Sequence, residues 1–334
     1  MKRSGKKLAV IGALLIAAGL LVSLIVLVMT DYDLSKLEGN RYTEKTYEFS
    51  SYEESNKVSE INITADTADI EFVFSEDLNY KVVCSETEKL SYSVYVDNGC
   101  LYVEPANSNK WYDFLDLKNI FGTWGENKVV VHLPHPRSDY TADLKVETDT
   151  GDIKILEFMK YKSIELSSDT GQVVVRAPAS EIINIHTNTG DVILDTSRSN
   201  NFHVETDTGD VMVSSVTGGD VYVKTNTGDI TFENCTLTKG VRIESDTGDV
   251  TLRLTTSDKG MRVTTNTGDV IFDRADADEM HITTDTGDVK GSLLTEKIFY
   301  VQTDTGHVNV PKITGADGLC EITTETGDVN ITIG

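Results

Sequence analysis

The sequence predicts an all-β protein, a single-chain parallel β-solenoid (β-helix) with about 19–20 residues per coil, preceded by one N-terminal transmembrane helix. Three observations lead to this prediction. The sequence Thr-Gly-Asp, or a close variant of it, recurs ten times along the chain. Apolar residues stand at fixed offsets around each of these glycines. An uninterrupted apolar run covers residues 8–29.

The glycines of the repeat are separated by 19 to 21 residues. A period this regular indicates one structural unit stacked on itself, so we expect one elongated body rather than several ordinary domains. We predict that these glycines are structural turn residues in a bend with positive φ. They are Gly151, Gly171, Gly190, Gly209, Gly228, Gly248, Gly268, Gly287, Gly306 and Gly327.

Each repeat unit is predicted to contain two strands. Apolar residues occupy the positions seven and five residues before nearly every glycine, and two and four residues after it. Alternation with a spacing of two predicts strands that bury one face. The order is therefore strand, tight turn, second strand and polar connection. A series of β-hairpins is the alternative, but stacking of each residue on its equivalent one coil away accounts better for the uniform inward positions.

The repeat and its flanking segments divide the chain into five parts. Residues 1–7 form a cytoplasmic tail, 8–29 the transmembrane helix, 30–59 a polar juxtamembrane stalk, 60–142 irregular N-terminal coils and 143–334 the regular solenoid. In the irregular part Ala68 replaces the repeat glycine, and a looser match surrounds Gly99. An insertion there carries Trp111 and Trp124. It is either a cap on the solenoid or an exposed aromatic patch for a partner.

The apolar run near the N-terminus indicates a membrane anchor. It holds 22 residues without a charge, and roughly 20 are needed to span a bilayer. Secretory signal peptides have a shorter apolar region and a small-residue cleavage site. Residues 26–30 offer no such site, so we favour a retained anchor, with cleavage as the alternative. Positive charges before the run place the N-terminus in the cytoplasm and the remainder outside, and these are Lys2, Arg3, Lys6 and Lys7.

The overall charge limits the class of partner. The formal net charge is −24 at pH 7. Contacts to phosphate groups need Lys and Arg, so this balance argues against nucleic acid and anionic lipid headgroups as partners.

The turns carry a regular acidic pattern. Asp follows glycine in eight of the ten repeats. Stacked equivalents lie about 4.8 Å apart, and each neighbouring pair repels by roughly 1 kcal/mol even in water. Hydrogen bonds to turn backbone are the offset we favour. The alternative is that divalent cations offset the repulsion, with Ca²⁺ as the cofactor. In that case the protein should melt at a higher temperature in Ca²⁺ than in chelator. This speculative cation ladder consists of Asp191, Asp210, Asp229, Asp249, Asp269 and Asp288.

Threonine flanks most of the turns. The positions one and three residues before glycine share the parity of the inward apolar positions. We therefore expect both columns to be buried, or to lie at a corner and bond to the backbone.

The pattern does not indicate catalysis. Catalysis needs one unrepeated constellation of residues in a cleft. Here the connections are short and none of the six histidines forms a metal motif. We therefore predict that the protein is not an enzyme. The cysteines also lack a Cys-x-x-Cys motif; Cys320 occupies an apolar repeat position, and Cys84 and Cys100 could pair across neighbouring strands.

The chain resembles the bacterial β-strand-repeat proteins filed as a domain of unknown function and often labelled candidate adhesins. The resemblance rests on the N-terminal apolar run, the Thr-Gly-Asp repeat and the segment Val-Val-Val-His-Leu-Pro at residues 129–134, and it covers about residue 60 to the end. It implies a repeat architecture and the bacterial cell envelope. Related domains also end membrane proteins of cell-wall antibiotic responses. The family has no agreed activity, so no catalytic residue is carried over.

These observations predict a non-enzymatic protein anchored in the bacterial cytoplasmic membrane. Its extracytoplasmic solenoid would act as an adhesin-like surface for a protein or cell-wall polymer. The alternative is a regulator that senses envelope stress and acts on a membrane partner through its helix. The last strand runs to residue 334. Because an open last coil leaves backbone groups unpaired, we expect end-to-end self-association there.

Overall fold

The computed structural model describes residues 40–50, 58–75, 79–87, 89–106, 123–134, 142–156, 160–316 and 318–334. Within these ranges no helix is long and apolar enough to cross a membrane. The predicted anchor at 8–29 and Trp111 lie outside the described residues. The chain divides into two compact units.

The smaller unit comprises Met1–Thr43, Glu86–Ser91 and Asn107–Glu126. In its described part, strand β1 (Asn40–Arg41) pairs in parallel with β8 (Thr123–Trp124). The Thr43 hydroxyl donates to the Glu86 carbonyl oxygen at 3.2 Å.

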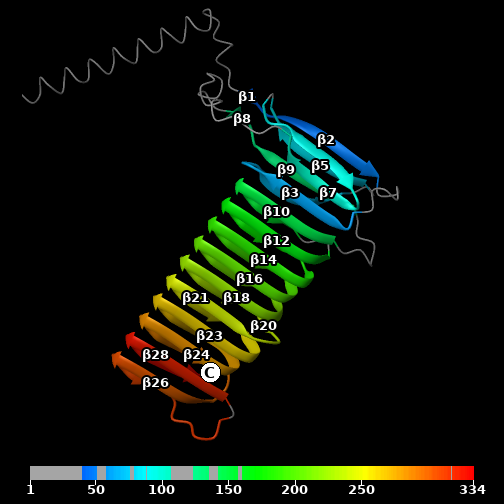
Figure 1. The fold of residues 1–334 in the computed structure, drawn as a ribbon. Coiled ribbons are helices and arrows are strands. Elements are labelled where there is room, and N and C mark those ends of the chain that lie inside the picture. The colour runs from blue at the N-terminus through cyan, green and yellow to red at the C-terminus, as the bar shows by residue number, and fades with distance from the viewer. Residues whose placement is uncertain are drawn as a thin grey trace, which may run out of the picture. The chain divides into compact units, whose positions relative to one another are not determined.

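The larger unit is a parallel β-solenoid, which confirms the predicted fold class (Figure 1). Each coil contributes one strand to a long-strand sheet and one to a short-strand sheet, and both sheets pair in parallel along the array. The long strands in chain order are β10 (Ala142–Thr150), β12 (Tyr161–Thr170), β14 (Ala179–Thr189), β16 (Arg198–Thr208), β18 (Thr217–Thr227), β20 (Thr236–Leu237) with β21 (Val241–Thr247), β23 (Thr256–Thr267) and β24 (Val270–Thr286). The short strands are β11 (Ile153–Ile155), β13 (Val173–Val175), β15 (Val192–Asp195), β17 (Val211–Ser214), β19 (Ile230–Glu233), β22 (Val250–Arg253), the first residues of β24, and β25 (Val289–Leu293).

The core lies between the two sheets and follows the apolar offsets of the repeat. In one coil, Ile183 and Ile185 of β14 face Val192 and Leu194 of β15, and all four are fully buried. Ile185 stands in register with Val204 of the next long strand. The inward positions therefore form continuous apolar columns. Each column consists of the residues that stand at the same distance in sequence from the turn glycine of their own coil.

The N-terminal end contains the coil expected around Ala68. Strands β3 (Glu60–Ala65) and β4 (Asp69–Phe74) pair with β10 and β11, and Ile61 aligns with Leu144. Beyond them lie β7 (Cys100–Pro105) and β9 (Lys128–Leu133). Strand β2 (Thr43–Ser50), which the sequence places in the stalk, pairs with β5 (Asn79–Glu86).

The looser match around Gly99 is not a coil of the solenoid. Strand β6 (Tyr92–Asp97) pairs with β7 in the antiparallel direction. Asn98 and Gly99 have φ of 48° and 81°, and an Asn-Gly pair with positive φ at both residues is the preferred two-residue hairpin turn. The hairpin alternative, wrong for the array, therefore holds at this one place. The disulfide that Cys84 and Cys100 could form is not present, and all four cysteines are free and buried.

The order of coils changes at the C-terminal end. Strand β28 (Gly318–Thr326) lies between β24 and β26 (Lys297–Thr305) (Figure 1). Strand β29 (Val329–Ile333) likewise lies between β25 and β27 (Val308–Asn309). The last coil of the sequence is thus second from the end in space. The expectation that residues 331–334 form the open edge is wrong. In the described residues the edge strands there are β26 and β27.

The polar connections are tighter than the sequence suggests. Six residues after glycine, five successive coils place a non-glycine residue in the left-handed region with φ of 49–55°. The inside of this corner is closed by small side chains: the Ser197 hydroxyl and Cys235 thiol donate to strand carbonyl oxygens at 3.2 and 3.4 Å. The left-handed residues are Thr196, Ser215, Asn234, Leu254 and Arg274.

The turn glycines are required mainly by the closeness of neighbouring coils. A Cβ on Gly209 would lie 2.2 Å from the carbonyl oxygen of Gly190, and one on Gly228 would lie 2.1 Å from that of Gly209. The predicted positive φ is found at nine of the ten turn glycines, 148° at Gly228, and Gly327 is the exception. Ala68 has no positive φ. It stacks over Asn127 rather than over a turn glycine, since Asp69 aligns with Lys128.

We expect Gly228→Ala to destabilise the solenoid by about 3 kcal/mol, because overpacking against backbone cannot relax. The measurement is the denaturant midpoint of the purified protein. Gly240→Ala is the control, because a Cβ there would meet nothing nearer than Asp220 Oδ1 at 3.6 Å. Equal midpoints for the two variants would contradict this account of the turn.

Candidate functional site

The aspartates after the turn glycines form one column along the edge of the solenoid. In each case the backbone N–H of one coil donates to Oδ1 of the aspartate in the coil before it. The distance is 2.9 Å from Asp210 to Asp191 and 2.8 Å from Asp229 to Asp210. The same bond joins Asp249, Asp269, Asp288 and Asp328 to the aspartate of the coil beneath. The carboxylates thus bond to the turn backbone of the neighbouring coil.

A second acidic column lies two residues before glycine. Here asparagine alternates with aspartate over several coils, and the Asn226 amide donates to Asp207 Oδ1 at 2.9 Å. Asn188 makes the same contact with Asp169. Because the amide takes the place of a carboxylate, fewer like charges are directly stacked in this column.

The two threonine columns differ, and the expectation of burial holds for one of them. Three residues before glycine the side chain is buried, and its hydroxyl donates to the preceding glycine carbonyl, as Thr225 does to Gly209 at 3.2 Å. One residue before glycine the side chain is exposed, as at Thr227. Strand parity breaks down at the turn, which is why the sequence pattern misplaces the second column.

One aspartate of the column also forms an ion pair with a lysine. Lys290 Nζ lies 2.5 Å from Asp269 Oδ2. Burial raises the pKa of Asp269, but the hydrogen bonds from Lys290 and from the Asp288 backbone outweigh it and hold that pKa below its usual value. In the described residues, no group of three or more His, Cys, Asp and Glu could hold a metal ion.

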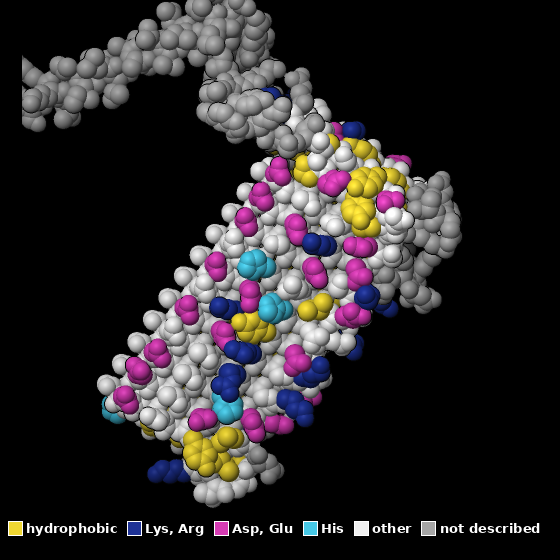
Figure 2. All heavy atoms as spheres, viewed as in Figure 1, with side chains coloured by type: hydrophobic (Ala, Val, Ile, Leu, Met, Phe, Trp, Pro, Cys, Tyr) yellow, Lys and Arg dark blue, Asp and Glu magenta, His cyan; other side chains and the backbone are white. Residues whose placement is uncertain are grey.

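The outer face of the long-strand sheet carries the least repetitive surface of the repeat. Six residues before glycine, consecutive strands place a basic and aromatic series in direct register. We name this series the outer-face array (Figure 2). It consists of His203, Tyr222, Arg242, Arg262 and His281.

Contacts within the array fix its side chains. The Tyr222 ring lies 4.9 Å from the His203 ring and 5.6 Å from Arg242 Cζ. Glu244, one strand away, accepts from the Tyr222 hydroxyl at 3.0 Å and from Arg242 Nε at 2.7 Å. Burial and this bond raise the pKa of Tyr222 to about 12. Burial raises the pKa of Glu244, but the Arg242 and Tyr222 bonds outweigh it and lower that pKa.

Among the described residues, some cations of the outer-face array are paired with a carboxylate and one is not. His281 Nδ1 lies 3.0 Å from Glu321 Oε2, and Arg242 is held by Glu244. Arg262 stands in register between Arg242 and His281, is exposed, and makes no ion pair within the described part of the chain. Like charges directly opposite each other destabilise a sheet. No motif along the chain indicates this array, because its members are about 20 residues apart and come together only when one offset stacks across successive coils.

The chain belongs to the Toastrack DUF4097 family, whose sequence model matches residues 58–262. No curated protein matches the chain. Solved structures similar to it include a candidate adhesin from Parabacteroides distasonis, with 9% identity, a TM-score of 0.46, and coverage of 87% of this chain and 97% of that one.

Two further solved structures have the same coverage. A candidate adhesin from Bacteroides fragilis has 11% identity and a TM-score of 0.39, over 87% of this chain and 97% of that chain. A candidate lipid-binding protein from Parabacteroides distasonis has 12% identity and a TM-score of 0.27, again over 87% and 97%. These similarities are too distant to assign a function.

The aspartate column leads to a prediction about cations. One oxygen of each column carboxylate accepts a backbone N–H, so Ca²⁺ should act only by screening the remaining charge. Because screening depends on ionic strength, we expect millimolar Ca²⁺ and Mg²⁺ to give the same melting temperature as chelator with NaCl at the same ionic strength. A rise specific to Ca²⁺ would contradict this and favour the cation ladder.

Proposed function

We propose that this protein is a non-enzymatic interaction module of the bacterial cell envelope. In this proposal residues 8–29 anchor it in the cytoplasmic membrane, and the acidic solenoid projects outside. The partner is a protein or cell-wall polymer that presents acidic groups to the outer-face array. The observation that carries the proposal is the exposed Arg262, which stands in register with Arg242 and His281 and makes no ion pair with any residue that the structure describes.

Physical reasons favour a binding role for the array. The inward columns and turns are nearly uniform because each must stack on its equivalent. The outward positions are free of that demand, so a series of Tyr, Arg and His needs another cause. Tyr and Arg are enriched where interfaces gain most of their binding energy. The Glu244 contacts hold Tyr222 and Arg242 in place before a partner arrives, which lowers the entropy lost on binding.

Crosslinking in living cells tests the proposal. A photoreactive residue at Thr264, two residues after Arg262, should give an adduct with a partner, and Arg262→Glu should abolish that adduct. A probe at Thr231, on the short-strand sheet, is the matched control, because both threonines are half-buried strand residues. Adducts that survive Arg262→Glu, or that form equally at Thr231, would contradict the assignment of this face.

We also propose end-to-end association of two copies through β26 and β27. Tyr300 is 63% exposed and Val308 is 47% exposed, although the position of Val308 is buried in the preceding coils. Within the described residues each of these strands has a partner on one side only. An exposed strand edge with apolar side chains favours pairing with another chain.

Sedimentation across a concentration series tests this association. We expect Val308→Glu to shift the protein to monomer. Met212→Glu should leave the association unchanged, since Met212 is equally exposed, at 47%, but lies in the middle of the stack. A strict monomer at high concentration before any substitution would count against the proposal.

A further inference from the structure

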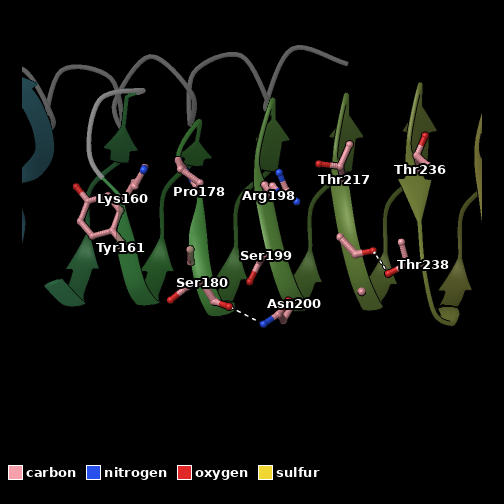
Figure 3. Close-up of a pocket in the computed structure, with 13 residues that line it drawn as sticks. Lys160, Tyr161, Pro178, Ser180, Arg198, Ser199, Asn200, Thr217, Thr236 and Thr238 are labelled. Carbon is pink, nitrogen blue, oxygen red and sulfur yellow. Dashed lines mark hydrogen bonds between the residues drawn. The ribbon is translucent and has the colours of Figure 1, made fainter. Parts of the chain in front are cut away.

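A groove of about 580 Å³ crosses five coils at the first residues of the long strands, next to the left-handed corners (Figure 3). It runs from the coil of Tyr161 to that of Thr236, four strand spacings or about 19 Å. One wall consists of Lys160, Pro178, Arg198, Thr217 and Thr236. The other wall includes Ser180, Asn200 and Thr238.

The residues at the bottom of the groove have small side chains or none. Ala179, Ser199 and Gly218 line it, with the buried Tyr161 at one end. A Cβ on Gly218 would lie 2.2 Å from the Ser199 carbonyl oxygen, and one on Gly219 would lie 2.1 Å from that of Asn200. These glycines break the repeat pattern. Glycine is needed at these positions because β18 approaches β16 closely. As a result, this stretch of the groove floor carries no side chains.

Several polar groups that line the groove have no partner within the described residues. Ser199 is 3% exposed, and its buried hydroxyl has no hydrogen-bond partner in the described residues. Lys160 and Arg198 are exposed, and neither makes an ion pair within the described part of the chain. The two exposed cations, which have no carboxylate partner within the described residues, are available to a ligand.

Two carboxylates near the groove are paired with cations, whereas the exposed Glu181, next to Ser180, makes no ion pair within the described residues. Asp220 lies 3.3 Å from Lys239 Nζ, and Asp195 lies 3.3 Å from Arg176 Nε. Lys160 and Arg198 give one wall a local positive charge in a chain whose net charge is −24. An anionic ligand fits this wall.

We infer that the groove binds a segment of an acidic polysaccharide, one whose sugars carry carboxylates. Its length suits a chain of sugars rather than a single ion. Pro178 supplies apolar surface for the C–H face of a sugar ring, and the Ser, Thr and Asn side chains of the walls supply partners for hydroxyl groups. The Arg198 guanidinium matches a carboxylate in a bidentate contact. This assignment concerns different residues from the outer-face array and stands or falls separately from it.

Binding of oligogalacturonate to the full chain tests the inference. The matched neutral control is the same oligomer with its carboxylates methyl-esterified. We expect the acidic oligomer to bind at least about tenfold more tightly than the ester, and Arg198→Gln and Lys160→Gln each to weaken it by about tenfold. Lys259→Gln removes an exposed cation outside the groove and should have no effect.

A second variant separates shape from charge. Thr217→Trp fills the groove without changing its charge and should abolish binding, while an unchanged melting temperature shows that the solenoid remains folded. Equal binding of acid and ester, or full affinity after Arg198→Gln, would overturn the acidic class. Full affinity after Thr217→Trp would overturn the location. Arg262→Glu should leave this binding intact, so failure here and failure of the crosslinking test are distinguishable.

Discussion

At each turn of the solenoid the backbone of one coil approaches the glycine carbonyl oxygen of the coil before it so closely that a methyl group does not fit. A Cβ on Gly228 would lie 2.1 Å from Gly209 O. This approach brings the turn carbonyl within reach of the buried threonine hydroxyl and the aspartate within reach of the next backbone N–H. The Thr-Gly-Asp repeat is therefore one hydrogen-bonded step, copied along the array, and the register of both sheets follows from it.

The spacing of glycines and apolar residues was sufficient to predict the coils, because each inward position must match its equivalent. The order of the end coils was beyond such reasoning, because the repeats of Gly306 and Gly327 both carry the apolar offsets, and these do not determine which repeat stacks on Gly287. The left-handed corners were missed for a different reason. Thr196, Leu254 and Arg274 share a backbone conformation but no residue type. The hairpin at Asn98 did carry a signal, its Asn-Gly pair.

The candidate sites lie where the repeat places least constraint. The outward positions of the long strands and the first residues of those strands need not match their neighbours, and these are the places where charge and size vary. On the turn edge, by contrast, the aspartates accept hydrogen bonds from the backbone of the adjacent coil. The sequence directs attention to the edge because it is the most regular feature, whereas binding surfaces in repeat proteins depend on departures from regularity.

The insertion of the last coil between its two predecessors has a consequence for how the molecule is made. A chain synthesised from the N-terminus completes β26 and β27 before β28 and β29 exist. Those strands cannot stay against β24 and β25 in the finished protein, because the final residues take that place. The end of the array therefore cannot be completed by simple growth from coil to coil. Closure of this end therefore depends on residues Gly318–Gly334, which are synthesised after the two strands that they separate from β24 and β25.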